Sequence, residues 1–305
     1  MEGTVIKTTG SWYDVRANDG TTYQCRLKGK FKTKGMKVTN PIAVGDMVKV
    51  TFDNDNETGV IYEILPRRNY LIRTSLKHPE IGHILASNLD QVILVATLSN
   101  PKTSLGFIDR FLVSAETFRI PAILVINKMD SYTASELKMA SQLQSMYQQI
   151  GYQTILTSFT NKQGIETLEE LMSGKTSLLS GHSGVGKSTL LNILVPEANQ
   201  KVSPISEFSA KGVHSTTFAE MFEVGPDSYL IDTPGIKELG LMEVGEEELS
   251  HYFPEMRALM GQCKFHDCSH VHEPKCAVIE AINHIVPESR YLSYLSMLEN
   301  HDNRR

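Results

Sequence analysis

Long hydrophobic runs, a secretion signal and a positive net charge are all absent from this sequence. Apolar stretches such as VILVATL at residues 92–98 are far shorter than the roughly 20 residues that cross a bilayer. The N-terminal MEGTVIKTTG has no basic region followed by an apolar core. A net charge of −5 excludes a protein that is basic over its whole surface, but it does not exclude a local basic patch. With 305 residues, 41% of them hydrophobic, we expect a globular, cytoplasmic, monomeric protein of two or three domains.

Cysteine is also scarce, and its distribution is uneven. Three of the four cysteines lie within fourteen residues near the C-terminus. This spacing is typical of a metal site rather than a disulfide framework, and it favours a reducing compartment. Three thiolates and one imidazole form the donor set of a closed, tetrahedral, structural zinc site. His266 and His272 are alternative ligands, and a chance cluster of reduced thiols is the competing interpretation. The predicted zinc ligands are Cys263, Cys268, His270 and Cys276.

Hydrophobic patterning divides the chain into three regions. Residues 1–70 alternate short β-rich runs with turn residues, including the strong hairpin signal Asp19-Gly20, which predicts a small antiparallel barrel or sandwich. In residues 71–240, buried apolar strands alternate with helical segments, which predicts a parallel sheet with helices on both faces. Residues 241–305 contain the Cys/His cluster and helix-like segments, and we expect a small helical domain that zinc holds together.

The segment GHSGVGKS at residues 181–188 matches Gly-x4-Gly-Lys-Ser, between a predicted strand and a predicted helix. Its glycines permit a tight loop whose backbone N–H groups surround phosphate oxygens. Lys187 supplies charge to the β- and γ-phosphates, and Ser188 ligates Mg²⁺. A glycine-rich turn without ligand is the alternative. The predicted phosphate contacts are Gly181, His182, Ser183, Gly184, Val185, Gly186, Lys187, Ser188 and Thr189.

The segment YLIDTPG at residues 229–235 ends an apolar strand at Asp232, which is suited to hold Mg²⁺ beside the serine of the phosphate loop. Gly235 would offer a backbone N–H to the γ-phosphate, although Asp-Thr-Pro-Gly is also an ordinary turn sequence. The preceding FSAKGVHSTTFAEMF, residues 208–222, is the expected switch loop. Either Thr216 or Thr217 would be a further magnesium ligand, and the spacing does not decide between them.

The segment NKMD at residues 127–130 follows the apolar run IPAILVI. An aspartate here accepts hydrogen bonds from the ring N–H and the exocyclic amine of guanine, a pair of donors that adenine lacks, and the lysine stem covers the base. Two residues at the end of a later strand, Thr157 and Ser158, are candidates to meet the guanine oxygen through a backbone N–H. A loop capped by polar side chains is the alternative. The predicted guanine contacts are Asn127, Lys128, Met129, Asp130, Thr157 and Ser158.

These motifs occur in a rotated order, in which the base motif precedes the phosphate and magnesium motifs. Joining the old ends of a compact domain and cutting it elsewhere is tolerated when the termini lie close together. As a consequence, the segment after Asp232 leads out of the nucleotide domain toward the C-terminal region.

The sequence also lacks a glutamine after the Asp-x-x-Gly turn, where many GTPases orient the attacking water. Ile236 occupies this place and cannot hydrogen-bond to a water, so we expect slow intrinsic hydrolysis. His214 in the switch loop is a candidate catalytic substitute, because a neutral imidazole accepts a proton from water. A solvent-facing loop histidine is the alternative.

A basic stripe follows the first predicted hairpin. Between residues 26 and 37 there is no acidic residue, and five of the six cations alternate along the chain, which places them on one face of an extended segment. Such a stripe suits an RNA backbone, and a five-stranded oligonucleotide-binding (OB) barrel commonly carries one. A solvated edge strand protected by lysines is the alternative. The predicted RNA contacts are Arg26, Lys28, Lys30, Lys32, Lys34 and Lys37.

Together, NKMD ahead of GHSGVGKS, then KGVHSTT, DTPG and Cys-x4-Cys-x-His-x5-Cys, resemble the ribosome small-subunit-dependent GTPase A family of circularly permuted bacterial GTPases. The resemblance extends over the whole chain. It implies an OB barrel, a GTPase domain and a zinc domain that engage the small ribosomal subunit and its rRNA late in assembly, with the subunit stimulating hydrolysis. It also favours His214 as the hydrolytic histidine, while Ser215 stands where the family usually has the first of three threonines.

We therefore expect a GTP hydrolase that binds GTP, GDP, Mg²⁺ and one Zn²⁺ and partners the small ribosomal subunit, with further assembly factors as conceivable partners. One alternative is an RNA-binding scaffold with a degenerate nucleotide site, although the intact Lys187, Ser188 and Asp232 disfavour it. Another is an ATP-using enzyme that shares only the phosphate loop.

Overall fold

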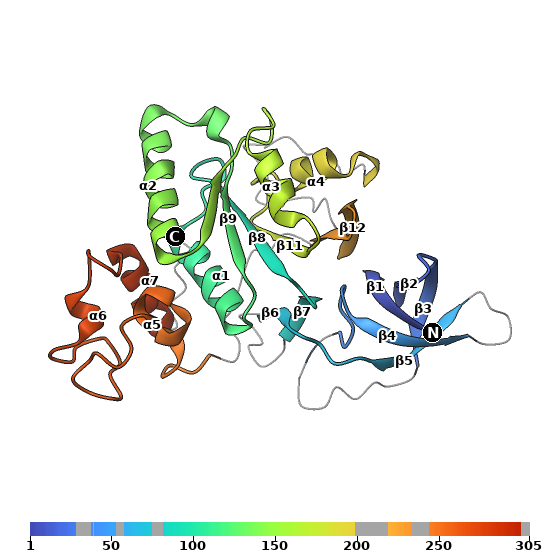
Figure 1. Ribbon diagram of the computed structural model, residues 1–305, viewed down its shortest axis with the longest axis horizontal. Helices are drawn as coiled ribbons and strands as arrows, with labels where there is room; N and C mark the ends of the chain where they lie inside the picture. Colours follow the sequence, from blue (N-terminus) through green and yellow to red (C-terminus); the bar gives the residue numbers. More distant parts are fainter. Residues whose placement is uncertain are drawn as a thin grey trace.

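The structure, a computed structural model, describes residues 1–28, 38, 40–52, 58–74, 82–198, 219–233 and 244–299. Its three parts lie in a row, with the N-terminal barrel at one end, an α/β domain in the middle and the C-terminal helices at the other end (Figure 1). Within these described ranges, no helix has both the length and the apolar character needed to cross a membrane.

The N-terminal barrel consists of β1 (Glu2–Thr9), β2 (Trp12–Ala17), β3 (Thr22–Leu27), β4 (Met47–Phe52) and β5 (Gly59–Ile64). The strand order is β1-β2-β3-β5-β4, and a pairing between β1 and β4 closes the sheet. Alternate residues such as Val5, Val15 and Ile61 point inward and are fully buried. The five-stranded barrel that the sequence predicted is therefore confirmed.

A two-stranded hairpin of β6 (Tyr70–Thr74) and β7 (Gly82–Ser87) connects the barrel to the central domain. Sequence patterning did not predict it as a separate unit, and the predicted domain boundary at residue 70 falls on its first residue. The buried carboxylate of Asp46 fixes the junction, since it accepts hydrogen bonds from Arg67 at 2.6 Å, from the Ser87 hydroxyl at 2.6 Å and from the Ala43 N–H at 2.9 Å.

The central sheet contains β8 (Gln91–Ala96), β9 (Ala122–Ile126), β10 (Gln153–Leu156), β11 (Thr176–Ser180), β12 (Glu220–Gly225) and β13 (Ser228–Asp232). The strand order is β10-β9-β8-β11-β13-β12. All neighbouring pairs are parallel except β12 and β13, which are antiparallel. The predicted parallel sheet is confirmed. The central strands β8, β9 and β11 are buried along almost their whole length, since helices cover both faces.

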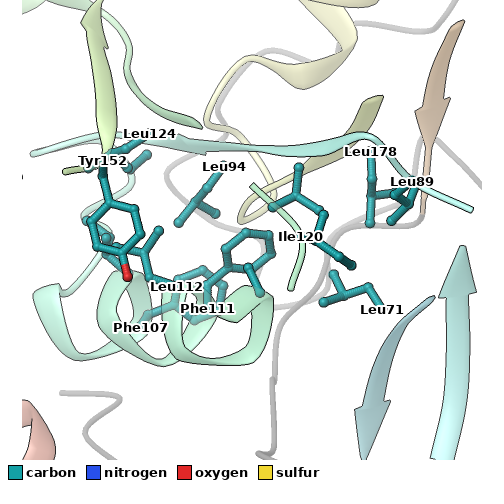
Figure 2. Packing of buried hydrophobic residues seen from close by; sticks show 14 of the residues in the cluster. Leu71, Leu89, Leu94, Phe107, Phe111, Leu112, Ile120, Leu124, Tyr152 and Leu178 are labelled. Carbon is teal, nitrogen blue, oxygen red and sulfur yellow. The ribbon is translucent and has the colours of Figure 1, made fainter. Parts of the chain in front are cut away.

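Helices α1 (Leu105–Thr117) and α2 (Ala134–Ile150) cover one face of the sheet, and α3 (Ile165–Met172) and α4 (Lys187–Leu194) cover the other (Figure 1). On the first face, Leu94 and Leu124 pack against Phe107, Phe111 and Leu112 (Figure 2). The neighbouring strand residues point to the opposite face, as the two-residue period of a strand requires. Two short 3₁₀ helices, η1 (Met129–Ser131) and η2 (Pro196–Ala198), lie in the connections.

The C-terminal part comprises η3 (Leu249–Tyr252), α5 (Pro254–Arg257), α6 (Ala277–Glu280) and α7 (Glu288–Leu298). It shares a hydrophobic cluster with Val113 of α1. Arg290 of α7 is fully buried and donates hydrogen bonds to Asp109 of α1 at 2.8 Å and to Glu255 of α5 at 2.7 Å. A buried cation with two carboxylates therefore joins this part to the first helix of the central domain.

Candidate nucleotide and zinc sites

The predicted phosphate loop lies between β11 and α4, with α4 beginning at Lys187. Gly181, Gly184 and Gly186 have positive φ angles of 142°, 84° and 111°, a region that favours glycine. A Cβ on Gly181 would lie 2.3 Å from the Val95 carbonyl oxygen, and one on Gly186 would lie 2.5 Å from the Asn127 amide nitrogen. Both the conformation and the close approach therefore require glycine at the ends of this loop.

Lys187 is nearly buried, and its ammonium group donates hydrogen bonds to the carbonyls of Gly181 at 2.7 Å and His182 at 2.9 Å. Burial lowers the pKa of Lys187 to about 8, while the nearby Asp232 carboxylate acts in the opposite direction. A buried cation whose charge is only partly compensated fits a site that receives phosphate.

Strand β13, which ends at the predicted magnesium ligand Asp232, lies next to β11, and Asp232 is paired in register with Leu179. Asp232 is 2% exposed at the carboxyl end of its strand, and Ser188 lies in the first turn of α4. A carboxylate and a hydroxyl are oxygen donors of the kind that Mg²⁺ prefers, so the two residues fit such an ion. The other predicted residues of this region, His214, Thr216, Thr217 and Gly235, lie outside the described residues.

Asn127 joins the guanine motif to the phosphate loop. Its side-chain amide donates a hydrogen bond to the Val185 carbonyl at 2.9 Å. Its side-chain oxygen accepts hydrogen bonds from the Thr157 hydroxyl and from the Phe159 N–H, each at 3.1 Å. One amide thus brings together three segments that are separate in the sequence.

Asp130 and Ser158 are paired, since the Ser158 hydroxyl donates to the Asp130 carboxylate at 2.5 Å. The backbone N–H groups of Thr157 and Ser158 donate to the carbonyls of Ile126 at 2.9 Å and Gln163 at 3.1 Å. The Thr157 and Ser158 hydroxyl groups thus contact two residues of the predicted guanine motif, Asn127 and Asp130. Lys128 has a φ of 72°, and its ammonium group donates to the Asn100 carbonyl.

Two aromatic contacts at this site were not apparent from the sequence. The Tyr132 hydroxyl accepts a hydrogen bond from the Leu98 N–H at 2.7 Å and donates one to the Asn127 carbonyl at 2.6 Å. The imidazole of His182 lies 3.9 Å from the Phe107 ring, measured between centroids. Burial and the charge of Lys187 lower the pKa of His182. No short motif marks Tyr132 or Phe107, because their partners come from other segments of the chain.

The predicted zinc ligands converge in the C-terminal part, with the donor atoms of Cys263, Cys268, His270 and Cys276 all within 4.8 Å of one another. The Nδ1 atom of His270 lies 3.4 Å from the Cys276 sulfur and 3.7 Å from the Cys263 sulfur, and the two sulfurs are 3.9 Å apart. Tetrahedral zinc bonds of about 2.3 Å to sulfur and 2.0–2.1 Å to nitrogen would separate donor atoms by about 3.5–3.8 Å. The cluster therefore fits a zinc ion, whereas the alternative ligands His266 and His272 are exposed and lie outside it.

Glu273 organises the loop that carries His270, a role that the sequence did not reveal. Its carboxylate accepts hydrogen bonds from the N–H and hydroxyl of Ser269 at 2.7 and 2.5 Å and from the N–H of Val271 at 3.0 Å. Although burial acts in the opposite direction, these bonds hold the pKa of Glu273 well below its usual range. From α7, the Tyr291 hydroxyl donates to the His270 carbonyl at 2.8 Å. Such outer contacts orient a metal ligand.

Of the basic stripe, the described residues Arg26 and Lys28 are exposed at the end of β3. The remaining predicted RNA contacts, Lys30, Lys32, Lys34 and Lys37, lie outside the described residues.

Two family profiles match the chain, the RsgA N-terminal domain over residues 2–61 and the RsgA GTPase over residues 64–242. The chain is 49% identical over 300 residues to the small ribosomal subunit biogenesis GTPase RsgA 2 of Bacteroides thetaiotaomicron, which covers 98% of this chain and 96% of that protein. It is 50% identical over 307 residues to the small ribosomal subunit biogenesis GTPase RsgA of Cytophaga hutchinsonii, with full coverage of both.

Two solved structures have the same fold over the whole chain. YjeQ from Thermotoga maritima superposes with a TM-score of 0.76 at 37% identity, covering 100% of this chain and 99% of that one. YloQ, described as a circularly permuted GTPase, superposes with a TM-score of 0.73 at 30% identity, covering 100% and 96%. With nucleotide motifs in the permuted order, a profile match over more than half its length and full-length relatives near 50% identity, the chain belongs to the RsgA GTPase family.

Proposed function

We propose that this GTPase acts in the late maturation of the small ribosomal subunit in the cytoplasm, and that the subunit stimulates its GTP hydrolysis. The bond from Asn127 to the Val185 carbonyl carries the nucleotide part of the proposal, because it joins the predicted guanine motif to the phosphate loop. The relatives in Bacteroides thetaiotaomicron and Cytophaga hutchinsonii, named for small ribosomal subunit biogenesis, support the biological part.

In this proposal, Asp130 reads guanine while Ser158 holds its carboxylate in position. The Lys187 ammonium group exchanges its two carbonyl partners for phosphate oxygens, whose negative charge stabilises the protonated form that burial disfavours. Ser188 and Asp232 hold Mg²⁺ together with Thr216 or Thr217, and the ion neutralises charge on the β- and γ-phosphates. Gly235 donates an N–H to the γ-phosphate.

The rate of GTP hydrolysis sets how long the protein stays bound to the subunit. With Ile236 in place of a glutamine, turnover is slow until the subunit positions His214 against the attacking water. The barrel, through the basic stripe from Arg26 to Lys37, and the C-terminal domain hold rRNA while GTP is bound, and hydrolysis weakens this binding. Zinc at the Cys263 cluster maintains the shape of the C-terminal domain.

The decisive experiment measures GTP turnover by the full-length protein with and without purified small ribosomal subunits across a range of salt concentrations. We expect strong stimulation that falls as salt rises, because the contacts with RNA are electrostatic. Absence of stimulation at every salt concentration would overturn the proposal. Binding to the subunits that is equal with GTP and GDP would instead favour an RNA-binding scaffold.

Replacing Asp130 with Asn tests base recognition in the same assay. The amide replaces one acceptor oxygen with a donor, so guanine affinity should fall and xanthine nucleotides, which carry an oxygen in place of the exocyclic amine, should be preferred. An ATP-using enzyme would show no change in its base preference.

A further inference from the structure

The N-terminal barrel and the central sheet form one continuous sheet of eleven strands. The junction is between β1 and β12, where Lys7 is paired in register with Glu220 and the Thr8 N–H donates to the Ala219 carbonyl at 3.3 Å. A strand of the barrel therefore continues the hydrogen bonding of the nucleotide domain, rather than packing loosely beside it.

Two barrel cations hold this junction. The Lys7 ammonium group lies 2.9 Å from the Glu220 carboxylate, and the Arg16 guanidinium group lies 3.2 Å from the Glu223 carboxylate. Arg16 also lies over the ring of Tyr229 in β13, 4.4 Å from its centroid. Arg16 thus contacts both β12 and β13, and its side chain is only 24% exposed.

Of the two strands held in this way, β13 ends at the predicted magnesium ligand Asp232, and β12 is paired with β13. Glu220 is also paired in register with Asp232. Lys7, Glu220 and Asp232 therefore lie side by side on β1, β12 and β13, which are neighbours in the sheet. In the sequence, β12 also contains the last residues of the predicted switch loop. A displacement of β1 would therefore change the position of β12 directly beside the magnesium strand.

We propose that Lys7 and Arg16 are positioning residues for GTP hydrolysis, which hold β12 and β13 so that RNA bound to the barrel acts on the nucleotide site. This inference rests on the proposed function, since it assigns the route by which the subunit stimulates turnover. Coupling of this kind is reciprocal for binding, so the nucleotide also changes the affinity of the barrel for RNA.

The test compares the full-length wild type with K7A/R16A and with K49A. Lys49 is a matched control, because its ion pair with Glu63, at 3.0 Å, lies within the barrel and does not reach β12. Turnover is measured at saturating small subunits, and binding to the subunits is measured separately by sedimentation. Basal turnover is measured for each protein without subunits, and each stimulated rate is compared with the basal rate of the same protein, because the inference concerns the stimulation. Stimulated kcat should fall about fivefold in K7A/R16A while binding is retained, and K49A should behave as wild type.

Wild-type stimulation in K7A/R16A would overturn the inference. An equal loss of stimulated turnover in K49A would also overturn the inference, because Lys7, Arg16 and Lys49 would then act only through their contact with RNA. If the subunit does not stimulate the wild type, that result counts against the proposed function only. The junction is then tested by hydrogen exchange of residues 219–225, measured without ribosomes. We expect faster exchange in K7A/R16A than in K49A, and equal exchange would contradict the positioning role.

Discussion

At the scale of single residues, the nucleotide site depends on side chains that make more than one hydrogen bond. Asn127 both donates to the phosphate loop and accepts from Thr157 and Phe159, which only a carboxamide of this length does. The Ser158 hydroxyl holds the Asp130 carboxylate, a contact that the sequence did not predict. Ser158 can therefore support the predicted guanine contact of Asp130 without touching the base itself.

Replacing Ser158 with Ala should weaken GDP binding about five- to tenfold, because Asp130 loses the hydrogen bond that orients its carboxylate, a loss of about 1 kcal/mol. S131A is the control, since the exposed Ser131 hydroxyl donates to the Lys128 carbonyl at 2.9 Å without contacting Asp130. Titration calorimetry with GDP measures both variants. Equal affinity of the two variants would show that Ser158 does not orient Asp130.

At the scale of elements, the site forms where parallel strands end together. β9 leads into Asn127, β11 leads into Gly181 and β13 ends at Asp232, so three motifs that are distant in the sequence meet at one edge of the sheet. The loop between β11 and α4 leaves no room for a side chain at its final glycine, because Asn127 occupies that space. Contact between the two motifs is thus a packing constraint as well as a hydrogen bond.

The G186A variant should bind nucleotide at least 100-fold more weakly than wild type, because its Cβ would lie 2.5 Å from the Asn127 amide nitrogen. G151A is a matched control: its φ of 112° is close to the 111° of Gly186, but nothing lies within 4 Å of an added Cβ. Both substitutions place a Cβ on a residue with a positive φ, which costs about 1–2 kcal/mol. Fluorescence titration with a labelled GDP measures the affinity of both variants and separates the steric clash from the backbone cost. Similar affinities of the two variants would contradict the packing constraint.

At the scale of the whole molecule, buried polar contacts decide how the parts are joined. Arg290 connects the C-terminal helices to α1, and Asp46 connects the barrel to the β6–β7 hairpin. Both are buried charges with several partners, and removal of one partner leaves the other group buried without compensation. The row of three parts in Figure 1 is therefore fixed at specific points.

R290A should lower the free energy of unfolding by about 3–5 kcal/mol, because Asp109 and Glu255 would remain buried without their cation. R257A is the control. Arg257 forms a half-exposed ion pair with Glu116 at 3.0 Å, and its loss should cost no more than about 1 kcal/mol. Urea denaturation followed by circular dichroism measures both, and similar losses would contradict a special role of the buried pair.

Removal of zinc should expose the three cluster thiols while Cys25 stays protected. Cys25 is fully buried in the barrel, and burial raises its pKa to about 11, so at pH 8 it is almost entirely a protonated thiol. Titration with a chromogenic disulfide should detect few thiols in the zinc-loaded protein, three after chelation and four in denaturant. Fast reaction of the cluster thiols before chelation, or unchanged melting and helix content after it, would contradict the structural zinc site.

Much of the molecule could be predicted from the sequence, because local patterns specify local structure. Alternating apolar residues predicted the barrel, buried apolar runs predicted the parallel sheet, and Gly-x4-Gly-Lys-Ser predicted the turn between β11 and α4. The hairpin β6–β7 and the roles of Tyr132 and Glu273 were not predicted, since each depends on partners from segments that carry no motif.

The sequence by itself determined the family of this protein and the order of its motifs, because the types and spacing of the predicted phosphate-, guanine- and zinc-binding residues are properties of short segments. Only the tertiary structure decided how these segments meet. It placed Asn127 against the phosphate loop, Ser158 against Asp130, and β1 of the barrel beside β12. These contacts depend on strand order and packing, and no single segment contains the information that fixes them.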